Sequence, residues 1–147
     1  MSENTPRFVD LLLEFWNTGN TSLVDQVYTD DLERFDPNAP EPLRGPDAVG
    51  KYVLETRGAF PDFRIELTQR ITEGDNFVHC WRCTGTHKAD FQGIPATNKK
   101  VTLEGVSVGL LKDGRVSQER VFFDRLNLLQ QLGAAPGQGF PQPSPRP

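Results

Sequence analysis

Two cysteines are the first side chains whose spacing could serve chemistry, because a Cys-x-x-Cys pair such as Cys80 and Cys83 can support redox exchange or zinc binding. The surrounding residues 77–84 are aromatic and β-branched, which is typical of a β-strand. Side chains three residues apart on a strand point to opposite faces and lie about 10 Å apart. A disulfide bridges Cα atoms no more than about 7 Å apart. The sequence therefore predicts two free thiols.

The two histidines, His79 and His87, are the other side chains suited to proton transfer or metal binding. Neither belongs to a group of His, Cys, Asp and Glu at metal-ligand spacing, so we expect no metal. The chain also carries no nucleophile elbow, phosphate-binding loop or dinucleotide fingerprint. Such motifs would have indicated an activated serine or a bound nucleotide.

Length and charge narrow the classes of partner. The 147 residues fit one domain, and the net charge is -4 with no run of basic residues. This argues against nucleic acid, since phosphate binding requires clustered Lys and Arg. No apolar stretch approaches the roughly 20 residues of a membrane span, and the N-terminus has no apolar signal region. We expect a cytoplasmic protein with neither membrane nor nucleic-acid partner.

Apolar periodicity predicts helices in the first half of the chain. A stripe at helical spacing indicates a helix over residues 5–17, with Thr5 and Pro6 at its start. A short helix is expected over residues 21–28, and a third begins at Pro46 and ends near Gly58. Residues 36–46, which are rich in proline, are expected to form a loop.

Strands are expected in the second half. Alternating or β-branched runs indicate strands from Phe63 onward and over residues 77–86, 101–111 and 116–123. Asp113 and Gly114 predict a two-residue hairpin turn, and Asp124 starts a last helix that Gly133 ends. Helices followed by antiparallel strands predict an α+β fold, with the helices on one face of a curved sheet and an apolar pocket between them. The domain is expected over residues 1–133, followed by a disordered tail over 134–147 that holds 5 of the 12 prolines.

Several short motifs, taken in order, resemble a known family. They are Trp16-Asn17-Thr18-Gly19, Gly85-Thr86-His87, the run 91–97, Lys112-Asp113-Gly114-Arg115-Val116, and the run 128–133. Their order and spacing are similar to those of the SnoaL-like polyketide cyclases (ester cyclases) of the nuclear transport factor 2-like superfamily, over about residues 6–133. The resemblance implies a conical α+β barrel with an internal hydrophobic pocket and oligomers built through the sheet. It also implies ring closure by intramolecular aldol condensation without a cofactor.

The catalytic residues of those cyclases are not retained at the corresponding positions. The acid/base aspartate falls on Val121, the glutamine and histidine of the preceding strand fall on Gly105 and Ser107, and the pocket asparagine falls near Arg34. Asp124 is a candidate substitute for the aspartate, although its place before a helix is typical of an N-cap.

The same alignment implies which strand faces point inward. Ser117, Glu119 and Phe123 share the face of Val121, and a second strand contributes Leu103, Gly105, Ser107 and Gly109. Glu119 is then the leading acid/base candidate, with a pKa raised by apolar neighbours such as Trp16, unless it pairs with Arg120 or Arg34. The two glycines indicate either a bend of the sheet or room for a ligand. The expected site comprises the catalytic candidates Glu119, His87 and Asp124, and the substrate contacts Trp16, Arg34, Trp81, Ser107, Val121 and Phe123.

Three functions remain open at this stage. The first is a cofactor-independent acid/base enzyme (cyclase, isomerase or lyase) acting on a small hydrophobic or polyketide-like molecule. The second is a protein that binds such a molecule without converting it. The third is a hydrolase similar to the limonene-type epoxide hydrolases, whose Asp-Arg-Asp set would take its arginine from Arg34 or Arg82. In each case we expect a homodimer through an outer apolar face of the sheet, formed by Val106, Val108, Leu110, Val116 and Phe122.

Overall fold

The computed structural model describes residues 7–134, so the predicted cap at Thr5 and Pro6, and the predicted tail apart from Ala134, lie outside the described residues. The helices are α1 (Arg7–Thr18), a 3-10 turn (Thr21–Leu23), α2 (Val24–Val27), α3 (Pro46–Ala59) and α4 (Arg125–Leu132). The strands are β1 (Tyr28–Phe35), β2 (Leu43–Arg44), β3 (Arg64–Glu73), β4 (Asn76–Thr86), β5 (Lys100–Lys112) and β6 (Arg115–Phe123).

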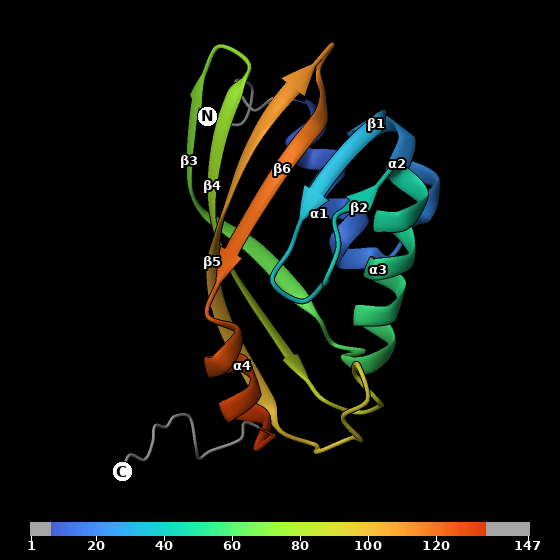
Figure 1. The fold of residues 1–147 in the computed structure, drawn as a ribbon, viewed down its shortest axis with the longest axis vertical. Coiled ribbons are helices and arrows are strands. Elements are labelled where there is room, and N and C mark those ends of the chain that lie inside the picture. Colours follow the sequence, from blue (N-terminus) through green and yellow to red (C-terminus); the bar gives the residue numbers. More distant parts are fainter. Residues whose placement is uncertain (1–6, 135–147) are drawn as a thin grey trace.

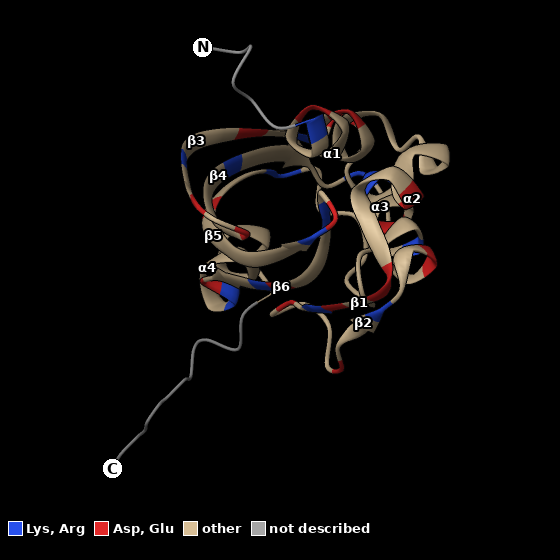
Figure 2. Cartoon of the chain, turned by 90° about the horizontal axis from the view of Figure 1, so that it is seen from above, with Lys and Arg blue, Asp and Glu red and all other residues tan. Residues whose placement is uncertain are grey.

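The six strands form one curved sheet in the order β2-β1-β6-β5-β4-β3 (Figure 1). All neighbouring pairs are antiparallel except β1 and β6, which run parallel. Seen from above, the sheet curls around a central space without closing, and α1 and α3 lie along its concave side (Figure 2). This architecture confirms the predicted α+β fold with helices on one face of a curved sheet.

Local signals explain where the helices begin and end. The apolar stripe of α1 buries Phe8, Leu12 and Phe15 against the sheet. The α4 helix begins where the Asp124 side chain accepts a hydrogen bond from the N–H of Asn127, and it ends at Gly133, whose φ of 75° is left-handed. No helix within residues 7–134 is long and apolar enough to cross a membrane.

The β5–β6 hairpin fixes which side chains of β6 face inward. Asp113 and Gly114 have φ values of 54° and 80°, as a two-residue turn of this hand requires. Past the turn the register shifts, since Leu111 pairs with Val116 whereas Leu110 pairs with Gln118. Ser117 is therefore an extra, unpaired residue of β6, that is, a β-bulge. Such a one-residue shift exchanges the inward and outward faces of β6 on the two sides of the bulge.

The bulge corrects one expectation. Val116, predicted on the outer face, is 1% exposed and packs in the core with Phe77. The rest of the predicted outer set keeps its phase, because Phe122 and Leu110 are 56% and 39% exposed. Val106 and Val108, which alternate with inward residues of β5, are half-buried on the same outer face.

A further difference is β1 itself, because the sequence predicted no strand over residues 29–35. Tyr28, expected at the end of a short helix, is instead the first residue of this strand. Residues 36–42 form the predicted loop, which the two-residue strand β2 follows. Pairing with β6 brings β1 into the wall of the central space.

Candidate functional site

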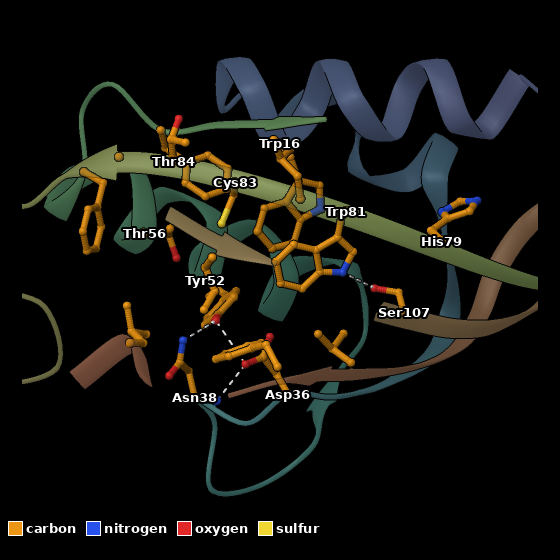
Figure 3. A pocket seen from close by; sticks show the side chains of 18 of the residues that line it. Trp16, Asp36, Asn38, Tyr52, Thr56, His79, Trp81, Cys83, Thr84 and Ser107 are labelled. Atoms are coloured by element: carbon orange, nitrogen blue, oxygen red, sulfur yellow. Dashed lines mark hydrogen bonds between the residues drawn. The ribbon is translucent and has the colours of Figure 1, made fainter. Parts of the chain in front are cut away.

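A cavity of about 110 Å³ lies between the concave face of the sheet and the helices. Its walls are mainly aromatic and aliphatic, and most of its polar groups gather where β1 meets β6 and α3 (Figure 3). The aromatic lining consists of Trp16, Tyr52, Phe60, Phe63, Trp81, Phe91 and Phe123. The cavity is therefore shaped for an apolar, ring-sized ligand with polar contacts at one place.

An arginine between two carboxylates forms that polar place. Arg34 Nη1 lies 2.7 Å from Asp36 Oδ2, and Arg34 Nε lies 3.1 Å from Glu119 Oε1. The backbone dictates this arrangement, because Arg34 of β1 is the direct register partner of Glu119 of β6 and Asp36 follows two residues after Arg34. All three residues are buried, with exposed fractions of 5 to 8%.

The surroundings of Arg34 keep it charged. Burial opposes the charged form, but Glu119 and Asp36 outweigh burial and raise the pKa of the guanidinium above its ordinary value. The guanidinium carbon also lies 5.0 Å from the ring centroid of Trp16 and 5.5 Å from that of Tyr52. These cation–π contacts hold the cation where it can face the cavity.

Two tyrosines and an asparagine support this cluster. Tyr52 Oη donates to Asp36 Oδ1 at 3.2 Å, and Asn38 Nδ2 donates to Tyr52 Oη at 3.4 Å (Figure 3). Tyr28 Oη accepts a hydrogen bond from Trp16 Nε1 at 3.1 Å. Burial raises the pKa of both phenols, with Glu119 adding to the shift at Tyr28 and Asp36 at Tyr52. Both side chains therefore remain neutral hydrogen-bonding groups.

The two carboxylates differ in the atoms they leave free. Both oxygens of Asp36 accept hydrogen bonds, one from Arg34 and the other from the N–H of Asn38 and from Tyr52. Glu119 uses only Oε1, and within residues 7–134 its Oε2 has no hydrogen-bond partner. The same holds for Arg34 Nη2. Glu119 and Arg34 both line the cavity, so its wall holds a carboxylate with one unused oxygen, a potential base, paired with a guanidinium that has N–H groups to spare as hydrogen-bond donors.

Two glycines of β5 make room for aromatic rings. Gly105 pairs directly with Trp81 of β4, and Gly109 pairs directly with Phe77. A Cβ atom at Gly109 would overlap the ring of Phe77, and one at Gly105 would overlap the indole of Trp81. The space beside these glycines is therefore filled by rings of the neighbouring strand rather than left for a ligand. Trp81 is fixed further by its Nε1, which donates to Ser107 Oγ at 3.1 Å.

The structure brings most of the expected site residues to this cavity. Those that line it are Trp16, Arg34, Trp81, Ser107, Glu119, Val121 and Phe123. Glu119 is inward and buried, and it is also paired with Arg34, so the two situations expected as alternatives occur together. Arg120 and Arg82 are exposed.

His87 and Asp124 do not line the cavity. Asp124 caps α4, as described above. His87 is fully buried behind the cavity wall, where its ring stacks on Phe60 with centroids 5.2 Å apart. Its Nδ1 accepts a hydrogen bond from the N–H of Thr97 at 3.2 Å, so the imidazole holds the loop in which Thr97 lies.

Among the lining residues that were not expected from the sequence are four with polar side chains, Asp36, Asn38, Tyr52 and His79. Asp36 follows Arg34 at the two-residue spacing of a strand, a signal that is readable only once β1 is recognised. Burial, followed by the nearby Arg70, lowers the pKa of His79 to about 4. Cys83 also lines the cavity with its pKa raised by burial to about 12, and both Cys83 and Cys80 are free thiols, as the sequence predicts.

Comparisons with known proteins agree with this architecture. The SnoaL-like polyketide cyclase family matches residues 7–132. Aklanonic acid methyl ester cyclase DnrD from Streptomyces peucetius is 29% identical over 126 residues, which cover 83% of this chain and 86% of that protein. The solved structure of TsrD from Streptomyces laurentii superposes with a TM-score of 0.78 at 23% identity, covering 87% of this chain and 93% of TsrD. A protein of ketosteroid isomerase-like fold from Catenulispora acidiphila, solved with trimethylamine, gives a TM-score of 0.74 at 14% identity, over 94% of this chain and all of that one.

Proposed function

The chain belongs to the SnoaL-like polyketide cyclase family, and from this premise we propose that it is a cofactor-independent acid/base enzyme acting on a small, apolar carbonyl compound of polyketide type. The observation that carries the proposal is the buried contact of Glu119 with Arg34 in the wall of an aromatic cavity, where Glu119 Oε2 and Arg34 Nη2 have no hydrogen-bond partner within residues 7–134. Abstraction of a proton next to a carbonyl requires these two groups, a base and a donor for the oxygen that becomes negative.

The reaction balances with these residues alone. Glu119 Oε2 takes a proton from the carbon next to a substrate carbonyl, and the C–H electron pair moves into an enolate. Arg34 Nη2 donates a hydrogen bond to the enolate oxygen, where the new charge gathers. In a ring closure the enolate carbon then attacks a second carbonyl carbon of the same molecule, and the resulting alkoxide takes the proton back from Glu119. The carboxylate is thereby regenerated.

The charge of the site restricts the substrate. One guanidinium faces two carboxylates, and the neighbouring phenols are neutral, so the buried cluster carries a net charge of -1. A substrate carboxylate would be repelled at close range in a medium of low dielectric constant. The cluster therefore favours an uncharged ketone or ester.

The test uses aklanonic acid methyl ester, the compound named for the DnrD relative, with chromatographic detection of product. Glu119→Gln keeps the shape of the side chain and removes the base, so we expect kcat to fall by about 10²- to 10⁴-fold. Glu104→Gln is the matched control, because it makes the same change at an exposed position of β5. A loss within about twofold for Glu119→Gln would exclude proton transfer by this residue. Binding of the ester without turnover by the wild-type protein would favour the non-catalytic alternative.

The Asp36–Arg34–Glu119 arrangement gives the epoxide-hydrolase alternative a specific observation of its own, because it places one arginine between two carboxylates. In that reaction Glu119 accepts a proton from a water molecule whose oxygen attacks an epoxide carbon. The C–O bond breaks, and the alkoxide formed takes the proton from Glu119, which leaves a diol and regenerates the carboxylate. Incubation with limonene 1,2-epoxide distinguishes the two candidates, since diol formation that is abolished by Glu119→Gln supports only the hydrolase.

We also propose a homodimer through the outer face of the sheet. Phe122 and Leu110 are exposed there beside Val106 and Val108, and a contiguous apolar patch of this kind is typical of an interface. Light scattering is expected to give twice the 16.5 kDa of one chain, and Phe122→Glu is expected to give the single chain. A 16.5 kDa wild-type species would refute the dimer.

A further inference from the structure

Three segments that are distant in the sequence meet at one end of the cavity. They are the loop 36–42 after β1, the excursion 87–99 between β4 and β5, and the helix α4. Each places a side chain in the cavity wall, namely Asn38, Phe91 and Leu128. The remaining walls come from the hydrogen-bonded sheet, from α1 and α3, and from Phe60 and Phe63 in the tight turn between α3 and β3, which a backbone hydrogen bond closes. A ligand can therefore reach the cavity most readily by separating these three segments.

Asn38 joins the other two segments to its own loop. Gln92 Nε2, from the excursion, donates to the backbone oxygen of Asn38 at 2.9 Å. Arg125 Nε, from α4, donates to Asn38 Oδ1 at 3.1 Å. Gln92 and Arg125 are exposed, so each of these bonds competes with water and can break at low cost.

The same asparagine also contacts the ion cluster. Its N–H donates to Asp36 Oδ1 at 2.7 Å, and its Nδ2 donates to Tyr52 Oη at 3.4 Å. Tyr52 and Asp36 are two of the residues that hold Arg34 in place: the Tyr52 ring lies against the guanidinium, and Asp36 Oδ2 accepts a hydrogen bond from Nη1. Asn38 therefore contacts the entrance through its two oxygens, and it contacts Asp36 and Tyr52, which support Arg34, through its two nitrogens.

We propose that Asn38 is a positioning residue that couples closure of this entrance to the placement of Arg34 beside Glu119. When Gln92 and Arg125 bind Asn38, the three segments are held together at the entrance and the loop holds Tyr52 and Asp36 against the guanidinium. When they release it, the entrance opens and the support of Arg34 loosens. The catalytic part of this inference rests on the function proposed above, whereas the closure does not.

The entrance is tested by acrylamide quenching of tryptophan fluorescence, which needs no substrate. The chain has two tryptophans, Trp16 and Trp81, and both line the cavity with exposed fractions below 10%. Gln92→Glu keeps the shape of residue 92 but replaces the donor with an acceptor. Loss of one such bond raises the open population by about twofold to tenfold, and quenching should rise with it. Lys88→Gln is the control, because Lys88 bonds Asn98 within the same loop and should leave quenching unchanged.

The coupling is tested with Asn38→Asp, which keeps an oxygen for Arg125 but removes the donor to Tyr52. We expect quenching close to that of the wild type, a shifted emission from Trp16 under the Arg34 guanidinium, and a lower kcat toward aklanonic acid methyl ester. Gln92→Glu should instead change KM more than kcat. Wild-type quenching in Gln92→Glu would overturn the entrance, and wild-type emission in Asn38→Asp would overturn the coupling. If both spectroscopic measurements change as expected but the wild-type protein does not convert the ester, the proposed function alone is refuted, and the entrance and the coupling stand.

Discussion

Replacing Arg34 by methionine is the most direct test of the ion cluster, because methionine keeps much of the length of the side chain and none of its charge. The Asp36 and Glu119 side chains are only 2% and 6% exposed, so water cannot substitute for the lost cation. Removing one partner of a buried ion pair costs about 3–5 kcal/mol. Here two carboxylates lose the same partner, and Glu119 loses the single hydrogen bond it makes within residues 7–134. We therefore expect a loss in the upper half of that range, which lowers Tm by roughly 10–20 °C for a domain of this size.

The free energy of unfolding is measured by urea titration followed by far-ultraviolet circular dichroism. Arg82→Met is the control, since Arg82 is exposed on β4 and its replacement should change stability by no more than about 0.5 kcal/mol. Adding Glu119→Gln to Arg34→Met removes one of the two uncompensated charges and should restore more than about 1 kcal/mol. A loss below about 1 kcal/mol for Arg34→Met, or no recovery in the double variant, would refute the view that Arg34 compensates two buried charges.

Two further predictions follow from the inner face of the sheet. Gly109→Ala should lower stability by about 1–3 kcal/mol in chemical unfolding, because the added methyl group overlaps the buried ring of Phe77, whereas Gly58→Ala, which meets no atom within 4 Å, should be neutral or stabilising. Burial lowers the pKa of His79 to about 4 in the folded protein, whereas in the unfolded chain the imidazole binds a proton near its ordinary pKa of 6.5. Stability should therefore fall by up to about 3 kcal/mol as pH drops from 6.5 to 4, and His79→Gln should remove that slope. A His79 nuclear magnetic resonance titration with a midpoint near 6.5 would contradict this reasoning.

The sequence predicts those parts of the fold that are specified locally. Asp113 and Gly114 define the β5–β6 hairpin because few residue pairs accept two positive φ values in succession. The strand β1 escapes prediction because the charged residues Asp30 and Asp31 interrupt its alternation and because its main partner, β6, is distant in the sequence. The face of Val116 could not be predicted either, since a bulge is an insertion relative to a partner strand and leaves no pattern in a single strand.

The residues of the candidate site also differ in whether local sequence is enough to predict them. Glu119 could be selected from the alternation of one strand once the family alignment supplied the phase. Its pairing with Arg34 could only be expected as one alternative, because the pairing depends on the register of two strands from opposite ends of the domain. Asp36 and Asn38 belong to the loop directly after the unpredicted strand, so the sequence assigned them no face.

The parallel pairing of β1 with β6 sets a time order on biosynthesis. Arg34 and Glu119 are 85 residues apart in the chain, so at about 5–20 residues per second a ribosome releases them roughly 4–17 s apart. During that interval the nascent chain carries Arg34 on a strand, with Asp36 directly after it, whose partner strand has not yet been made, apart from the two residues of β2. Helices α1 to α3 and the β3–β4 hairpin can form first, but the ion cluster assembles only after translation has passed β6. A chain released before that point contains most of the domain but lacks Glu119, the base of the proposed acid/base site.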